Sequence, residues 1–124
     1  EYVELLQNVV LNTLTAFGIK GATKVNTPGV WVEDRKISSI GIRIHNGVAT
    51  HGLSLNVLGA LTGFSYILAC NDPQMLQTTL RSEGQTLADW DTILGIFVGQ
   101  VETVFGIQLS WQNANHYKNL RVLT

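Results

Sequence analysis

Cysteine and proline are scarce in this chain of 124 residues, and charge of neither sign is concentrated in it. The single cysteine, Cys70, excludes a disulfide within the chain, which is typical of a reducing compartment. A formal net charge of −1 without a basic run does not favour nucleic acid or anionic membranes as partners. The apolar stretches are far shorter than the roughly 20 residues that a membrane-spanning helix needs.

Hydrophobic residues make up 45% of the chain, which is enough for the core of one domain. The opening segment, EYVELLQNVV, carries acidic residues where a signal peptide has basic ones. It also lacks a helix cap and resembles the middle of a helix. We therefore expect further residues upstream of Glu1.

The pattern of apolar and turn-forming residues predicts the order of the secondary structure. The expected elements are a helix over 3–17 that ends at Gly18, a loop over 20–29, a strand over 30–34, a hairpin over 36–56, a helix over 86–105 that begins at a capping-box-like Thr-Leu-Ala-Asp and ends at Gly106, and a last strand over 107–111. This order predicts an α+β fold, with a mainly antiparallel sheet and flanking helices.

The segment KISSIGIRIHNGVATHGLSLN, residues 36–56, predicts a β-hairpin because Asn46-Gly47 favours a two-residue type I′ turn. Such a turn fixes which residues lie opposite each other and therefore share a face. One face is largely apolar and is expected to build core: Ser38–Leu55, Ile40–Leu53, Ile42–His51 and Ile44–Ala49. The opposite face carries the pairs Ile37–Asn56, Ser39–Ser54, Gly41–Gly52 and Arg43–Thr50.

Gly41 opposite Gly52 leaves a bare patch of backbone on the second face, with Ser39 and Ser54 at its edges. We call these four residues the trough. Glycine weakens a strand interior and often marks a place where another molecule approaches the main chain. The alternative is that the two glycines only relieve twist or accept a covering helix.

Two residues of this region have the chemistry of a catalytic site. Strict alternation places Lys36 on the core-facing side with Ser38 and Ile40, where an amine can serve as a base or orient a thiol; the alternative is a solvated lysine at a strand end. Cys70 follows a short apolar run and precedes Asn-Asp-Pro, where a loop would present a reactive thiol. The alternative for Cys70 is inert packing, which is usual for a free cysteine.

The histidines do not indicate a metal site, because His45, His51 and His116 lack ligand spacing and there is no second cysteine. For His51, a hydrogen-bonding role and a catalytic role both stay open. The sequence contains no phosphate-binding loop, no Gly-x-Ser-x-Gly elbow and no paired-carboxylate motif.

Three segments taken together resemble the C-terminal half of the lipoyl(octanoyl) transferase family. They are TPGVWVEDRKISSIGIRI, THGLSLNV and FSYILAC, which follow one another within about the first 70 residues. The specific features are Gly-Val-Trp-Val, Lys-Ile-x-Ser-Ile-Gly-x-Arg, His-Gly-Leu-x-Leu-Asn-Val and the cysteine that follows them. The combination is specific to the family, whereas each piece alone is weak evidence.

The resemblance implies a fold shared with lipoate and biotin ligases, with residues 1–124 forming the C-terminal portion of one catalytic domain. It implies transfer of an octanoyl group from acyl carrier protein to a lysine of lipoyl domains, including those of 2-oxoacid dehydrogenases and the glycine cleavage H protein. By motif position, Cys70 would carry the acyl group as a thioester, and Lys36 would lie beside it and favour the thiolate. The implied acyl contacts are Ser39, Ile40, Gly41, Gly52, Leu53 and Ser54. No metal or nucleotide cofactor is implied, because the thioester donor already carries the driving energy.

The sequence also departs from the family. The family's N-terminal half, with its Arg-Gly-Gly and His-Gly-Pro-Gly stretches, is absent from these residues, and we expect that a companion chain supplies it, that the chain is a fragment, or that the half has been lost. Ala69 and Asn71 stand where the family usually has proline and glycine around the cysteine.

Two other functions stay open. An ATP-dependent lipoate ligase has the same fold, although Cys70 favours the transferase. A non-catalytic lipoyltransferase-like subunit of a larger assembly is the alternative that the missing half supports. The expected location is the mitochondrion, or the cytoplasm for a bacterial protein.

Overall fold

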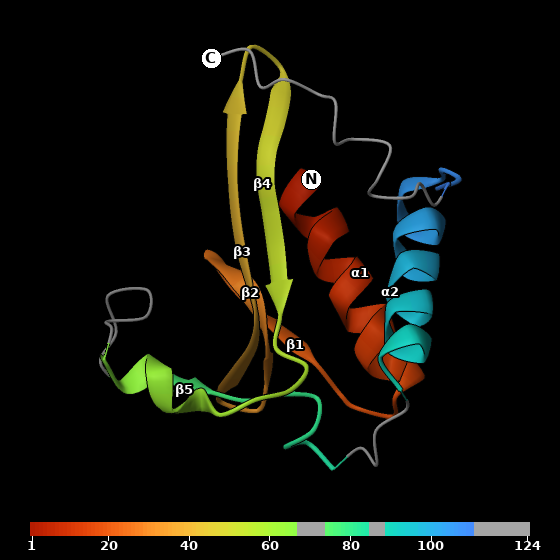
Figure 1. Ribbon diagram of the computed structural model, residues 1–124. Helices are drawn as coiled ribbons and strands as arrows, with labels where there is room; N and C mark the ends of the chain where they lie inside the picture. The colour runs from red at the N-terminus through yellow and green to blue at the C-terminus, as the bar shows by residue number, and fades with distance from the viewer. Residues whose placement is uncertain (67–73, 85–88, 111–124) are drawn as a thin grey trace, which may run out of the picture.

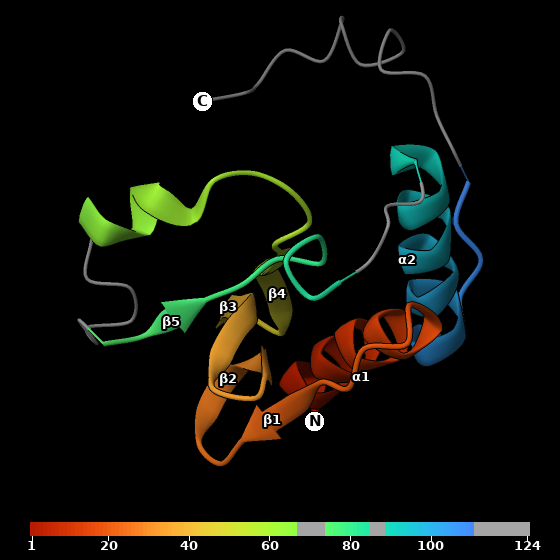
Figure 2. The ribbon, with the colours of Figure 1, turned by 90° about the horizontal axis from the view of Figure 1, so that it is seen from below.

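The computed structural model describes residues 1–66, 74–84 and 89–110 (Figure 1). The elements in chain order are α1 (Tyr2–Ala16), β1 (Ala22–Lys24), β2 (Thr27–Val32), β3 (Arg35–His45), β4 (Val48–Leu55), the 3-10 helix η1 (Leu61–Tyr66), β5 (Leu76–Gln77) and α2 (Trp90–Phe105). The five strands form one sheet in the order β1-β2-β3-β4, and β5 pairs with β3. Both α-helices lie on one side of the sheet and η1 lies on the other (Figures 1 and 2). The α+β fold with a mainly antiparallel sheet is therefore confirmed.

Helix α1 packs its apolar face on the sheet, as its periodicity predicts. Leu6, Val9, Val10 and Leu14 are buried along this face. Gly18, with φ of +72°, follows the helix in the left-handed conformation expected at its end. The core between sheet and helices contains Val10, Leu14, Ile19, Val30, Val32, Ile37, Leu80 and Ile93. Burial of each such side chain contributes about 1.5–3 kcal/mol to stability, so this aliphatic cluster holds the two layers together.

The predicted loop over 20–29 is wrong in part, because it contains β1 and the start of β2. These two strands pair antiparallel, with Ala22 opposite Trp31 and Lys24 opposite Thr27. Asn26, with φ of +56°, makes the turn between them. Turn-forming residues dominate this stretch, and only the pairing with β2 makes β1 a strand.

Helix α2 begins later than the capping-box pattern predicts. Asp89 caps it by accepting a hydrogen bond from the backbone N–H of Thr92 at 2.9 Å, and Gly106 ends it in the left-handed conformation, as expected. The proposed cap Thr86 lies outside the described residues. The predicted last strand is wrong for 107–110, which form no regular element. Among the described residues, no helix has the length and hydropathy needed to span a membrane.

Candidate functional site

The β3–β4 hairpin has the register that the Asn46-Gly47 turn predicts. Gly41 lies opposite Gly52, and Ser39 lies opposite Ser54. A Cβ atom built on either glycine would meet no atom within 4 Å. The trough is therefore a strip of open backbone, and the described residues place no covering helix on it.

A β-bulge between β2 and β3 corrects the predicted position of Lys36. Val30 pairs with Ser38, but the next residue, Trp31, pairs with Lys36, so Ile37 is the extra residue. Val30 faces the helices, so its neighbour Trp31 and the paired Lys36 face the other way. The prediction from strict alternation, that Lys36 lies beside Ser38 on the core side, is wrong because the extra residue Ile37 moves Lys36 to the opposite face.

The same bulge moves Ile37 into the core. The sequence places Ile37 on the trough face opposite Asn56, whereas the structure buries it completely among the residues that face α1. The contact of Asn56 with Ile37 is a hydrogen bond from the Asn56 backbone N–H to the Ile37 carbonyl, at 2.9 Å. The ladder between β3 and β4 thus ends at Ser38–Leu55.

Lys36 lies on the same face as the trough. Gly29 pairs with Ser39 and stands two residues before Trp31, so Gly29, Trp31, Lys36 and Ser39 share one side of the sheet. The Lys36 side chain is only 1% exposed, and its Nζ lies 5.3 Å from the centroid of the Trp31 ring. The alternative of a solvated strand-end lysine is therefore wrong. Lys36 is therefore a buried amine on the same face of the sheet as the open backbone of the trough.

Ile40 and Leu53 differ from the other implied acyl contacts. They pair across the hairpin, and Leu53 packs against the core and lines an apolar cavity of about 370 Å³ with residues of both helices. Their side chains therefore point away from the trough. Of Ile40 and Leu53, only the backbones border the trough formed by Ser39, Gly41, Gly52 and Ser54.

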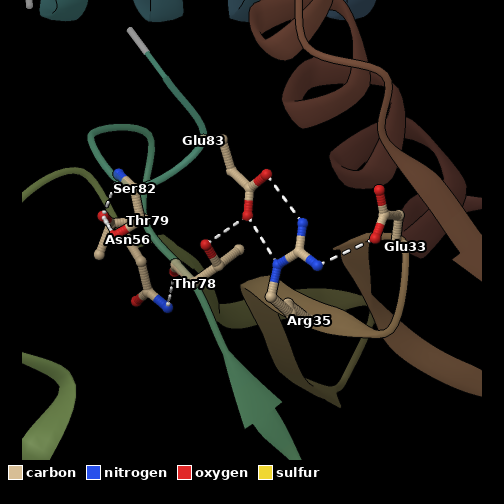
Figure 3. A network of polar contacts seen from close by, with 7 residues as sticks. All are labelled: Glu33, Arg35, Asn56, Thr78, Thr79, Ser82 and Glu83. Atoms are coloured by element: carbon tan, nitrogen blue, oxygen red, sulfur yellow. Dashed lines mark hydrogen bonds and ion pairs between the residues drawn. The ribbon is translucent and has the colours of Figure 1, made fainter.

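A polar network fixes the chain beside Lys36 (Figure 3). Strand β5 runs parallel to β3 with Gln77 opposite Lys36, and the N–H of Thr78 donates to the Lys36 carbonyl at 2.9 Å. The Arg35 guanidinium donates to both carboxylate oxygens of Glu83 at 2.9 Å, and the Thr78 hydroxyl donates to the same carboxylate at 2.5 Å. These contacts hold residues 76–83 against the start of β3.

The electrostatics of this network follow from the same contacts. Hydrogen bonds from the Arg35 guanidinium hold the pKa of Glu83 below its usual value; burial, the next largest effect, raises this pKa, and the Thr78 hydroxyl lowers it by less. The Glu83 side chain is 12% exposed and that of Arg35 is 34% exposed. Glu83 is therefore ionised at neutral pH and acts as an anchor for the chain that follows β5.

Cys70 lies outside the described residues, as does His116. The described chain resumes at Gln74, and Gln77, seven residues after Cys70, is paired with Lys36. His45 and His51 are exposed on the hairpin. His51 is unusual because its φ is +70°, which is rare for a residue with a side chain inside a strand.

Sequence reasoning missed Trp31, Arg35, Thr78 and Glu83 as neighbours of the site. The run Val-Trp-Val-Glu-Asp indicates a strand, but nothing in it tells which face Trp31 takes. Glu83 is 48 residues from Arg35, so its contact is not readable from either local sequence.

The fold and this geometry define a class: an α+β domain with two helices on one face of its sheet and a buried lysine beside an open hairpin on the other. Residues 1–93 match the family model described as the lipoyl protein ligase A/B catalytic domain. The chain therefore belongs to the lipoyl protein ligase A/B catalytic domain family, and the resemblance seen in the sequence is confirmed.

Similar proteins named octanoyltransferase occur in several bacteria. The chain is 43% identical over 81 residues to that of Buchnera aphidicola (subsp. Schizaphis graminum), covering 65% of this chain and 37% of the relative. It is 37% identical over 103 residues to that of Neisseria meningitidis serogroup C, covering 83% and 50%. It is 40% identical over 82 residues to that of Dictyoglomus thermophilum, covering 66% and 35%. The chain thus spans half or less of each relative's length, and these bacterial relatives give the expected mitochondrial location no support.

Proposed function

We propose that this chain forms the part of an octanoyltransferase that carries the nucleophile and its supporting lysine. The observation that carries the proposal is the burial of Lys36 on the trough face, beside the strand that follows the Cys70 segment. The names of the relatives supply the reaction, and the residues supply the chemistry.

In the first step, the Cys70 thiolate attacks the carbonyl carbon of an octanoyl thioester on acyl carrier protein. A new carbon–sulfur bond forms to Cys70, the bond to the carrier sulfur breaks, and the carrier thiolate leaves and takes up a proton. The Lys36 ammonium favours the Cys70 thiolate by its charge, which is the usual means of activating a cysteine. The octanoyl chain lies along the trough, where Gly41 and Gly52 leave room for it.

In the second step, a lysine amine of a lipoyl domain attacks the Cys70 thioester. A carbon–nitrogen bond forms, the carbon–sulfur bond breaks, the amine loses a proton and the Cys70 thiolate is regenerated. The lipoyl domains of 2-oxoacid dehydrogenases and the glycine cleavage H protein are the acceptors in this proposal. Because an amide is more stable than a thioester, the transfer needs no metal or nucleotide.

Chain connectivity is consistent with this assignment. Gln77 is seven residues after Cys70, and seven extended Cα-to-Cα steps reach about 25 Å at most. Gln77 lies next to Lys36 in the sheet. The proposal requires that the chain before β5 bring Cys70 to this amine, and the contacts between Glu83 and Arg35 hold the chain that follows β5 against the start of β3.

Mass spectrometry tests the proposal directly. The native protein, incubated with octanoyl-acyl carrier protein, should gain one octanoyl group on Cys70 and lose it when a lipoyl domain is added. Cys70→Ser should abolish the adduct and leave the melting temperature nearly unchanged. An adduct that persists in Cys70→Ser, or a large fall in melting temperature with retained transfer, contradicts the assignment.

A non-catalytic, lipoyltransferase-like subunit is the second candidate, favoured by the chain's span of half or less of its relatives. A folded protein that never acquires an octanoyl group, even with a polypeptide that supplies the rest of the domain, would support it. Octanoylation that requires free octanoate and ATP would instead indicate a ligase.

A further inference from the structure

Trp31 is the largest fully buried side chain of the described residues, and it lies on the side of the sheet away from the aliphatic core. The core between sheet and helices is built from aliphatic side chains. Trp31 faces the other way, with two ammonium groups over its ring: Lys36 Nζ at 5.3 Å from the ring centroid and Lys24 Nζ at 5.1 Å. A large ring that meets two cations outside the aliphatic core has a role beyond filling space.

We propose that Trp31 is the positioning residue of Lys36 in acyl transfer, holding its ammonium group by a cation–π contact while Gly29 leaves room for its stem. This inference rests on the proposed function, because it assigns Lys36 to the activation of Cys70.

The backbone brings the two side chains together. Trp31 and Lys36 are opposite residues at the β-bulge, so their side chains leave the sheet on the same face and in close proximity. The 5.3 Å separation lies within the approximately 6 Å range of a cation–π interaction, which is strongest when the cation is desolvated. Lys36 is 1% exposed, so its ammonium is desolvated and the cation–π interaction with Trp31 is of the stronger kind.

Gly29 completes the arrangement. A Cβ atom at this position would lie 2.8 Å from Lys36 Cε, 2.8 Å from the backbone oxygen of Ser38 and 3.1 Å from the Cη2 atom of Trp31. The lysine stem and the indole edge therefore both lie over the bare Cα of Gly29. Its φ of +146° also favours glycine, so the residue is fixed by conformation and by space. An added methyl group would press both on the lysine stem and on the Ser38 carbonyl of the paired strand.

Lys24 provides the matched control. Its ammonium lies over the same ring at a similar distance, but Lys24 is exposed to solvent. Solvent weakens a cation–π contact, so removing Lys24 should change little. Lys24→Met removes a positive charge near the indole without affecting the contact between Trp31 and Lys36, whereas the Trp31 variants remove that contact. Comparing them distinguishes the positioning of Lys36 from a general loss of positive charge near the indole.

The first experiment observes Lys36 itself, without reference to activity. In a ¹³C-labelled protein, the Lys36 Hε resonances, assigned by their loss in Lys36→Met, should be displaced by the ring current of Trp31. Trp31→Leu should abolish this displacement, Trp31→Phe should retain part of it, and Lys24→Met should preserve it. Unchanged Lys36 resonances in a folded Trp31→Leu protein would overturn the proposal.

The second experiment follows the rate at which iodoacetamide alkylates Cys70 as a function of pH. Trp31→Leu should slow alkylation near neutral pH by about two- to thirtyfold, in the direction of Lys36→Met, and Trp31→Phe should recover part of the rate. If Trp31→Leu does not fold, Trp31→Phe carries the same test. An unaltered profile in Lys36→Met would refute the activation of Cys70. An altered profile in Lys36→Met, with wild-type behaviour in the Trp31 variants, would refute this inference alone.

Discussion

The pair between Glu83 and Arg35 should stabilise the protein measurably, and Glu83→Gln tests this. Glutamine has the same shape and keeps one oxygen for the Thr78 hydroxyl, but it loses the charge that meets both guanidinium donors at 2.9 Å. Hydrogen bonds to charged groups contribute about 1.5–3 kcal/mol, and the partial exposure of Arg35 reduces this. We expect Glu83→Gln to lower the free energy of unfolding by about 1–2 kcal/mol.

The effect should depend on pH with a definite sign. Because Arg35 lowers the pKa of Glu83 in the folded state, the folded protein binds this proton less tightly than the unfolded chain does. The stabilisation is therefore fully present above the ordinary glutamate pKa of about 4.3 and is lost as the pH falls through the lowered pKa of the folded state. The difference between wild type and Glu83→Gln should shrink on acidification.

Urea denaturation followed by circular dichroism, from about pH 7 down to about pH 3, measures this difference. Glu33→Gln is the matched control, since Glu33 binds the same guanidinium at 3.0 Å but its side chain is 78% exposed. Its loss should change the free energy of unfolding by less than about 0.5 kcal/mol. An equal loss in both variants, or a difference for Glu83→Gln that does not vary with pH, would refute the reasoning.

Two further predictions concern the hairpin. Gly41→Val should leave the fold intact, because a Cβ atom there meets nothing within 4 Å, but it should fill the trough and slow octanoylation of Cys70. Thr50→Val, on the same face nearer the turn, is the control. An equal octanoylation rate in both variants would show that the acyl chain lies elsewhere. His51→Gly should be more stable than His51→Ala by about 0.5–1 kcal/mol, because φ of +70° strains any residue with a Cβ atom; equal midpoints in urea would contradict this.

Elements set by local sequence were predictable, and those set by a distant partner were not. The Asn46-Gly47 turn determines the hairpin register by itself, and Gly18 and Gly106 end their helices because a left-handed residue is needed there. In contrast, β1 and β5 have two or three residues each and are strands only because β2 and β3 pair with them.

The candidate site shows the same division. The trough was predictable because Gly41 and Gly52 are brought together by the turn alone. The face of Lys36 was not, because the bulge that sets it depends on how β3 pairs with β2. The alternation of polar and apolar residues in β3 contains no sign of an extra residue at Ile37.

The bulge joins the stability of the fold to the chemistry of the site. With strict alternation, the Lys36 ammonium would point into an aliphatic core, where burial of an ion without a partner costs several kcal/mol. The extra residue turns Lys36 to the ring of Trp31 and lets Ile37 fill the core in its place. Arg35, one residue earlier, binds Glu83 and holds the chain beside the lysine. Three consecutive residues therefore have three roles: Arg35 anchors the chain after β5, Lys36 belongs to the candidate site, and Ile37 fills the core. Substitutions at Arg35, Lys36 and Ile37 should accordingly affect the anchoring of residues 76–83, acyl transfer and the free energy of unfolding, respectively.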